Sequence, residues 1–302
     1  MSAPELQSNP DNFCYRHPER QSFVLCQRCL RTICPECQTQ MPVGVICPEC
    51  LRDQQAASGA PRARRAPRIL RAVRSSDSQP IVTYSIIGLT VFTFIVTMIP
   101  GGLGGTVQNA LSMFAPALYP QYSNGAFQPW RLFTVLIVHG GIWHLALNML
   151  ALWMLGSSLE PLLGRMRFLW LYLLSGLGGS VAIVLLGYGT PVVGASGAIF
   201  GLFGALLVIG RHVGANVTGI AVVLGINLVI TFLPLLTGST GFAVSWQAHI
   251  GGLAVGALVG LIFARTRAIR RRRAQTLLLA ATTVALFALL AVPIVAPNLI
   301  LV

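Results

Sequence analysis

The chain has 302 residues, of which 54% are apolar and only 10% are charged, and this composition excludes an ordinary water-soluble domain. It predicts a polytopic membrane protein with a polar N-terminal extension. The net charge of +13 comes from arginine alone. Because the arginines cluster before and between apolar runs, we expect them to orient the chain in the membrane, and we expect no nucleic-acid partner.

Residues 1–55 contain all seven cysteines, which together with His17 form four pairs of potential metal ligands. The pairs are Cys14-x2-His17, Cys26-x2-Cys29, Cys34-x2-Cys37 and Cys47-x2-Cys50. Eight ligands are enough for two tetrahedral zinc ions, and no cysteine is left over. Since every coordination position is filled, we expect the zinc ions to hold the fold without chemistry of their own. The extension is polar from its start, so no cleaved signal peptide is predicted.

This spacing resembles a B-box-type zinc finger. The resemblance implies a cross-braced arrangement and a protein partner for the domain. In that arrangement one ion is bound by Cys14, His17, Cys34 and Cys37, and the other by Cys26, Cys29, Cys47 and Cys50. The spacing alone leaves sequential pairing open.

Residues 56–79 are rich in Ala, Arg, Pro and Ser and are predicted to form a flexible basic linker. Seven membrane spans are expected after it: Ile81–Ile99, His144–Leu159, Phe168–Gly187, Ser196–Gly210, Val217–Leu236, Gln247–Phe263 and Ala274–Val292. Every second connection is basic, which places the N-terminus in the cytoplasm and the C-terminus outside. The long connection between the first two spans, residues 100–143, is therefore expected on the outer side.

Ser196 and His249 lie near the outer ends of the fourth and sixth predicted spans. A hydroxyl and an imidazole inside a membrane are costly, which favours a functional role. Glycines next to both allow two helices to approach closely, and these are Gly194, Gly197, Gly252 and Gly256. We expect the two side chains to meet as a serine nucleophile and its base. The alternatives are an N-cap serine and a histidine that serves only packing.

His144 and Asn148 lie four residues apart on one face of the second predicted span, and His139 precedes it. A metal site is disfavoured, because asparagine is a poor ligand for transition metals and no carboxylate completes the set. Neutral donors that face a cavity fit an oxyanion site better. The pair Trp130-Arg131 comes earlier, and Arg131 is the only charge expected on the outer side, where it braces the loop or meets lipid headgroups.

Glu160 is the only carboxylate after Asp77. It lies sixteen residues beyond His144, about 24 Å along a helix, at the cytoplasmic end of its span. A Ser-His-Asp triad is therefore excluded, and any serine chemistry runs on a dyad or on a base steadied by a neutral partner. We expect Glu160 to pair with Arg165 or Arg167, or to cap its span.

Together these residues resemble the rhomboid intramembrane serine proteases, over roughly residues 80–265. The resemblance implies that Ser196 is the nucleophile and His249 the base. It implies an oxyanion site made by His144, Asn148 and the backbone N–H of Ser196. Residues matched to the family's structural motifs are Trp130, Arg131, His139, Gly194, Gly197, Gly252 and Gly256. The family's core has six helices, so the seventh span and the zinc domain are additions here.

The predicted fold is an all-α polytopic membrane protein: a rhomboid-like six-helix core plus a seventh C-terminal transmembrane helix, with a small N-terminal zinc-binding domain. Its segments are the zinc domain (1–55), the linker (56–79), the protease core (80–265), and a basic loop with the seventh helix (266–302). The composition indicates a bacterial plasma membrane protein whose active site opens to the outer side.

The predicted activity is hydrolysis of peptide bonds in or near transmembrane segments of membrane proteins, by a Ser-His dyad that needs no metal. The main alternative is a catalytically inactive relative that binds transmembrane helices. A transporter is disfavoured, because the spans lack internal repeats and buried carboxylates. A membrane protein whose zinc domain is the active part is a further alternative.

Overall fold

The computed structural model describes residues 10–41, 44–57, 79–100, 102–187, 189–237 and 245–299. The chain divides into two compact units, Met1–Arg74 and Ser75–Val302, and each is described by itself. Most of the predicted linker, 58–78, lies outside the described residues.

The N-terminal unit is small, and its described residues, 10–41 and 44–57, form short elements. Its two hairpins pair β1 (Phe13–Cys14) with β2 (His17–Gln21), and β3 (Thr39–Gln40) with β4 (Val45–Ile46). Short 3-10 turns, η1 (Pro10–Asn12) and η2 (Pro35–Cys37), and helix α2 (Pro48–Ala57) complete it. Its buried side chains are mostly cysteines, with Ile33 and Ile46. So few apolar side chains make a poor core, which fits a fold that depends on metal.

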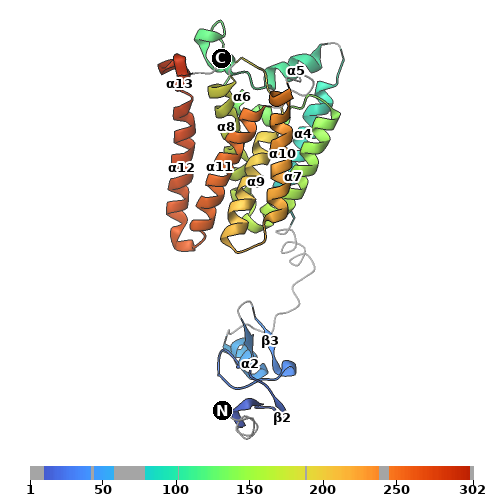
Figure 1. The fold of residues 1–302 in the computed structure, drawn as a ribbon, viewed down its shortest axis with the longest axis vertical. Coiled ribbons are helices and arrows are strands. Elements are labelled where there is room, and N and C mark those ends of the chain that lie inside the picture. The colour runs from blue at the N-terminus through green and yellow to red at the C-terminus, as the bar shows by residue number, and fades with distance from the viewer. Residues whose placement is uncertain are drawn as a thin grey trace. The chain divides into compact units, whose positions relative to one another are not determined.

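The second unit is a helical bundle. The long helices among its described residues are α4 (Ile81–Thr97), α7 (Ile142–Leu163), α8 (Arg165–Leu186), α9 (Ser196–His212), α10 (Thr218–Thr237), α11 (Trp246–Arg265) and α12 (Arg272–Leu289). Each coincides with one expected span (Figure 1). The prediction of an all-α polytopic membrane protein with a small cysteine-rich N-terminal domain is confirmed.

Among the described residues, four stretches are long and apolar enough to cross a membrane: Ile142–Leu163, Arg165–Leu186, Trp246–Arg265 and Arg272–Val295. Shorter apolar helices are Ile81–Thr97, Ser196–His212 and Thr218–Leu233. Short elements between and after them are α5 (Leu103–Leu111), η3 (Ala115–Leu118), η4 (Pro120–Tyr122), α6 (Arg131–Thr134), η5 (Val135–Ile137), η6 (Ile269–Arg271), α13 (Val292–Val295) and η7 (Pro297–Leu299). The predicted outer connection is therefore largely helical.

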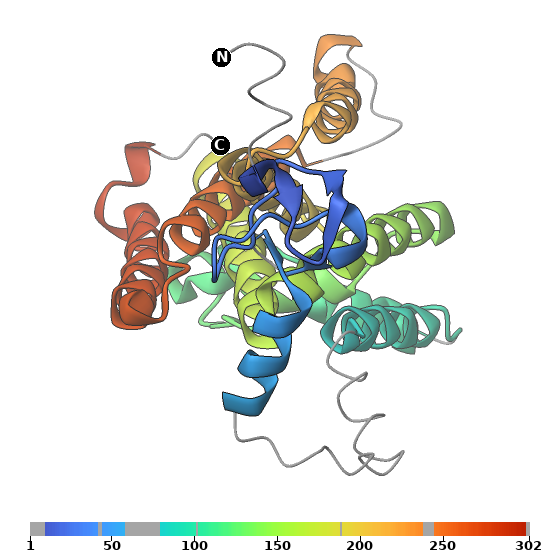
Figure 2. The same cartoon turned by 90° about the horizontal axis from the view of Figure 1, so that it is seen from below.

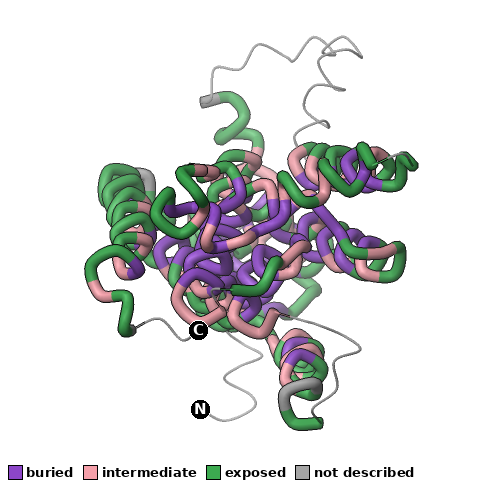
Figure 3. The backbone as a smooth tube through the Cα atoms, turned by 90° about the horizontal axis from the view of Figure 1, so that it is seen from above, coloured by how far each residue is buried: buried purple, intermediate pink, exposed green. Residues whose placement is uncertain are grey.

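Burial falls from the middle of the bundle to its edge. Viewed along the helices, the buried backbone gathers centrally, and the outer helices are mostly exposed (Figure 3). Helix α8 is 67% buried over its apolar window, whereas the stretch beginning with α12 is only 11% buried. Helix α12, drawn in red, lies at one side of the bundle in both views (Figures 1 and 2). An apolar, exposed outer surface fits a lipid environment.

Helices α9 and α11 pack almost backbone to backbone, because glycines face each other along both. A Cβ atom added to Gly252 would overlap the carbonyl of Gly197, and one added to Gly256 would overlap the backbone of Gly201. One turn further, a Cβ atom on Gly260 would lie 2.7 Å from the Cα atom of Ala205. Since dispersion between closely packed helices replaces the hydrophobic effect inside lipid, this contact holds the two helices in one register.

Glu160 caps the start of a neighbouring helix. Its carboxylate accepts hydrogen bonds from the backbone N–H groups of Val82 (2.9 Å) and Thr83 (2.8 Å), and from the Thr83 hydroxyl (2.8 Å). Free N–H groups at a helix N-terminus carry partial positive charge, which a carboxylate neutralises. The expectation of a cap was right in kind, but the helix that it caps is α4 and not its own.

Candidate active site and metal centres

Ser196 is the first residue of α9, and a turn that contains a glycine precedes it. Gly194 has a φ of +126°, a conformation that L side chains rarely adopt. A Cβ atom at this position would also lie 2.8 Å from the His144 ring. The N-cap residue of α9 is Ala195, so Ser196 does not cap its own helix. Its half-buried hydroxyl instead contacts a side chain of another helix. The first N–H groups of α9 lack hydrogen-bond partners within the helix.

The side chain that Ser196 contacts is His249, in the first turn of α11. Its Nε2 atom lies 2.8 Å from Ser196 Oγ, and the imidazole is only 5% exposed. The hydroxyl of Ser245 accepts a hydrogen bond from the N–H of Ala248, which fixes where α11 begins. Because α9 and α11 begin side by side, two residues 53 positions apart in sequence share one hydrogen bond.

Two further side chains hold His249, and the sequence analysis missed both. Thr231 of α10 is buried, and its Oγ1 atom lies 2.8 Å from His249 Nδ1. The ring of Phe200, one turn after Ser196, stacks on the imidazole with centroids 4.0 Å apart and planes 12° from parallel. The imidazole is thus held at both nitrogens and on one face. A threonine inside an apolar helix was the available signal for the first of these contacts.

His139, His144 and Asn148 form a second polar group beside the start of α9. The His139 and His144 rings meet edge to face, with centroids 5.0 Å apart. His139 Nε2 lies 3.4 Å from the N–H of Ala195, which donates to it. Asn148 donates through Nδ2 to the His144 carbonyl (2.8 Å), and its Oδ1 atom is buried without a hydrogen-bond partner among the described residues. The structure therefore brings His144 to the entry of α9, while Asn148 is tied to the backbone of α7.

Trp130 and Arg131 brace the connection between α4 and α7. Arg131 is 8% exposed and donates to the carbonyls of Asn109 (2.5 Å) and Ser112 (2.6 Å), and to the Gln128 side chain (2.6 Å). Trp130 Nε1 donates to the carbonyl of Ala110 (3.0 Å). Of the two roles expected for Arg131, loop bracing agrees with these contacts.

A small recess of about 10 Å³, room for about one water molecule, lies beside Ser196. Its lining comes from α8, α9, α11 and the segments before α9, and includes Gly194, Ser196, Gly197, Gly179, Ser180 and Ala248. Small residues keep this space free, since a Cβ atom on Gly179 would lie 2.9 Å from the Ala248 carbonyl.

Comparison with known proteins identifies the domain that contains these residues. Residues 126–266 match the Rhomboid domain. This chain carries a rhomboid domain. The matched stretch runs from before Trp130 to the end of α11, so it contains Ser196, His249 and their neighbours. The N-terminal domain and α12 lie outside it.

The rhomboid domain is also shared with curated relatives. The chain is 39% identical over 189 residues to "Rhomboid protease GluP" of Bacillus subtilis, which covers 59% of this chain and 34% of that protein. It is 37% identical over 141 residues to "RHOMBOID-like protein 1" of Arabidopsis thaliana, which covers 44% of this chain and 34% of the relative. The chain thus spans about a third of the length of either relative. It is homologous to rhomboid proteases, which suggests a serine peptidase.

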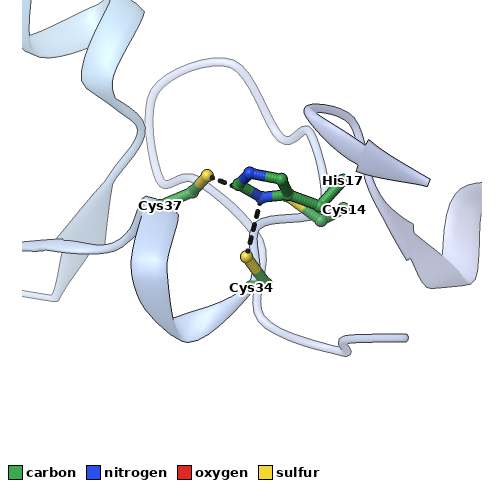
Figure 4. Close-up of side chains that lie close together, drawn as sticks. All are labelled: Cys14, His17, Cys34 and Cys37. Carbon is green, nitrogen blue, oxygen red and sulfur yellow. Dashed lines mark hydrogen bonds between the residues drawn. The ribbon is translucent and has the colours of Figure 1, made fainter. Parts of the chain in front are cut away.

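The N-terminal unit holds two tetrads of potential metal ligands. They are Cys14, His17, Cys34 and Cys37, and Cys26, Cys29, Cys47 and Cys50. Within each tetrad the ligand atoms all lie within 4.8 Å of one another. Figure 4 shows the first, with the three cysteines around the His17 ring. The tetrads interleave along the chain, which is the cross-braced order and not the sequential one.

The spacing of the ligand atoms fits tetrahedral zinc. A Zn–S bond of about 2.3 Å gives a tetrahedron edge of about 3.8 Å. The sulfur atoms of Cys29 and Cys47 are 3.8 Å apart. In the other tetrad His17 Nδ1 lies 3.3 Å from Cys34 Sγ and 3.4 Å from Cys37 Sγ. The donor set of seven thiols and one imidazole is also the one that zinc prefers.

Backbone groups favour thiolates in both tetrads. Burial alone raises the pKa of the Cys14 thiol, but hydrogen bonds from backbone N–H groups, that of Cys34 foremost, outweigh it and bring the pKa to about 6. The pKa of Cys26 falls to about 6 in the same way, with the N–H of Cys47 foremost. Burial and the neighbouring sulfur atoms instead raise the pKa of Cys37 to about 11. Because the pKa of Cys14 is lowered and that of Cys37 is raised, these two thiols of one tetrad are deprotonated together at neutral pH only beside a cation.

Proposed function

We propose that this chain is an intramembrane serine endopeptidase that cuts membrane proteins in or near their transmembrane segments. The observation that carries the proposal is the 2.8 Å contact between Ser196 Oγ and His249 Nε2 at the start of α9. Homology to rhomboid proteases supports it. The catalytic residues would be Ser196 as nucleophile and His249 as base, within a core of residues 80–265.

The reaction follows from the geometry in ordered steps. His249 Nε2 removes the proton of Ser196 while Oγ attacks the carbonyl carbon of the scissile bond. The developing oxyanion is held by the backbone N–H of Ser196, at the positive end of α9, and by donors from His144 and Asn148. Nε2 then returns the proton to the leaving amine. Water enters from the outer side and releases the acyl group by the same steps in reverse.

Asn148 retains a donor for this role. Its amide has two hydrogens and one is bonded to the His144 carbonyl, so the other remains for an oxyanion. His144 is placed for it by Gly194, the only residue type that lets the ring approach this closely. The structural residues Trp130, Arg131, His139, Gly197, Gly252 and Gly256 would hold these parts in place.

The proposed substrates are single-span proteins whose helix is locally unstable. A transmembrane helix hides its carbonyls in its own hydrogen bonds, so a cut needs a segment that unwinds at low cost. Gly, Pro or Ala near the cut would provide it. The enzyme would lie in the plasma membrane of a bacterium, with its N-terminus in the cytoplasm and its active site open to the outer side.

The zinc domain, residues 1–55, would bind two structural zinc ions and a protein partner, and catalysis would need no metal. The linker (56–79) and the segment 266–302, with the seventh helix, would be additions to the protease core.

The experiment is cleavage of a panel of single-span substrates in liposomes by wild type, Ser196→Ala and Ser158→Ala. Ser158 is exposed on α7 and bonds only the carbonyl of Met154 among the described contacts, so it is the matched control. We expect cleavage by wild type and Ser158→Ala, and none by Ser196→Ala. If wild type only binds the substrates, the chain is the inactive helix-binding relative. If Ser196→Ala cleaves normally, the catalytic assignment is wrong.

A further inference from the structure

His249 also contacts a third helix, α10. Its Nδ1 atom, on the side of the ring away from Ser196, lies 2.8 Å from Oγ1 of Thr231, which is 3% exposed. Thr231 belongs to α10, whereas Ser196 and His249 belong to α9 and α11. Building on the proposed protease function, we propose that Thr231 is a positioning residue that sets the tautomer and orientation of His249, so that the site is a Ser196–His249–Thr231 relay.

The direction of the hydrogen bond follows from counting protons. A threonine hydroxyl has one hydrogen and two lone pairs. Thr231 Oγ1 also lies 2.7 Å from the carbonyl of Asn227, one turn earlier in α10, and a carbonyl can only accept. The single hydrogen of Thr231 therefore goes to Asn227. Towards His249 the hydroxyl must then act as the acceptor, so the hydrogen of a neutral imidazole is on Nδ1.

This assignment leaves His249 in the form that a base needs. With its hydrogen on Nδ1, the ring presents a lone pair at Nε2, 2.8 Å from Ser196 Oγ, and accepts the serine hydrogen. The opposite tautomer would place a hydrogen on Nε2 and could not take the serine proton. The hydrogen bond from the Thr231 hydroxyl to the backbone of α10 therefore determines which nitrogen of His249 presents a lone pair.

The contact also persists through the reaction. When Nε2 takes the proton of Ser196, the imidazolium still donates from Nδ1 to Thr231, and the ring does not have to turn. The stacked ring of Phe200 blocks rotation out of this plane. A hydroxyl carries no charge, so it orients the imidazolium but stabilises it less than a carboxylate would. Glu160, the only carboxylate after Asp77, caps α4 and takes no part.

Substitutions can distinguish a positioning role of Thr231 from a role in packing alone. Thr231→Val keeps the side-chain shape and removes the hydroxyl, while Thr231→Ser keeps the hydroxyl. Thr237→Val is the matched control, because Thr237 lies on the same helix and makes the same kind of bond to the carbonyl four residues earlier (2.9 Å), but it is exposed. Each variant is compared with wild type and Ser196→Ala, as full-length protein in liposomes with one single-span substrate.

We expect Thr231→Val to lower kcat by about 10- to 100-fold with KM within about twofold, because the base is misoriented but substrate binding is not. Thr231→Ser should restore kcat to within about threefold of wild type, and Thr237→Val should be unchanged. Nitrogen NMR of protein labelled at histidine reports the tautomer directly. The His249 signal, identified by its loss in His249→Asn, should show hydrogen on Nδ1 in wild type and a mixture in Thr231→Val.

The outcomes separate this inference from the proposed function. If Ser196→Ala cleaves like wild type, the protease assignment fails. If Ser196→Ala is inactive but Thr231→Val has wild-type kcat, or Thr231→Ser is as slow as Thr231→Val, the relay is wrong and the dyad stands. A His249 hydrogen on Nε2 in wild type also overturns the relay, even without any turnover. Should Thr231→Val fail to fold, Thr231→Ala replaces it under the same criteria.

Discussion

The two units of this chain are held together in opposite ways. In the N-terminal unit most of the buried residues are ligand cysteines, and the described part contains few apolar side chains that could replace them. In the membrane unit α9 and α11 meet through glycines, with the backbone of one against the backbone of the other. We therefore expect the first unit to depend on the metal ions that its cysteines would bind. The second depends on the small size of the glycines between its helices. Each should fail under a perturbation that the other tolerates.

Metal removal should have the largest effect, and it should be confined to the zinc domain. Structural zinc contributes about 10–16 kcal/mol of apparent folding free energy in small domains, more than the few apolar contacts here can replace. On addition of a strong chelator we expect the zinc domain's amide signals to collapse, while the unfolding temperature of the bundle and the cleavage rate stay unchanged. Metal analysis should give two zinc ions per chain before treatment.

Single ligand substitutions sharpen this prediction. Cys34→Ala removes a ligand of one tetrad only, so it should lower the zinc content towards one ion per chain. Arg52→Ala, at an exposed position on α2, serves as control and should keep both ions. A zinc domain that keeps its folded signals after complete metal removal would contradict the comparison.

Adding a methyl group to a glycine between α9 and α11 should have the next largest effect, and it should affect only the helical bundle. Gly252→Ala places a Cβ atom onto the carbonyl of Gly197, so the starts of α9 and α11 must separate. A shift of about 1 Å between reacting groups costs about 100-fold in rate, and overpacking costs about 1–3 kcal/mol of stability. Gly225→Ala on α10 is the matched control, since its Cβ atom would meet nothing within 4 Å. Equal cleavage rates and unfolding temperatures for both variants would refute the close packing.

Loss of the Arg131 side chain should have a smaller effect. Arg131→Ala leaves the carbonyls of Asn109 and Ser112 without their donor, at about 1–3 kcal/mol for each buried group. We expect a lower unfolding temperature and slower cleavage, because the segment before α7 loosens. Arg273→Ala, at an exposed position, should change neither. Identical melting curves for the two variants would show that the loop holds without its arginine.

Tyr119→Phe should have the smallest effect. The Tyr119 hydroxyl donates to the carbonyl of Leu290 (2.7 Å), which ties the connection between α4 and α7 to the end of α12. One neutral hydrogen bond contributes about 1 kcal/mol, so the unfolding temperature should fall slightly with zinc content unchanged. Tyr84→Phe, at an exposed tyrosine of α4, is the comparison variant, and a shift as large as that of Tyr119→Phe would discount the contact.

The two units also differ in how far their sequence predicts them. The eight potential metal ligands follow from spacing alone, because each pair is local and thiols have few other uses in such a pattern. The spans follow from apolar runs, and Ser196 and His249 from their glycine neighbours. Thr231, Phe200 and the helix capped by Glu160 do not follow. An apolar helix has no polar face to fix its rotation, so the sequence does not say which side of α10 meets α11.

The central claim is that Ser196, activated by His249, is a nucleophile. The most direct measurement is mass spectrometry of the full-length protein after reaction with a serine-directed fluorophosphonate. The account predicts one adduct, on the peptide that contains Ser196, with labelling strongly slowed in His249→Ala and unaffected by Thr237→Val. An adduct on another serine, or labelling of Ser196 at the same rate in His249→Ala, would contradict it.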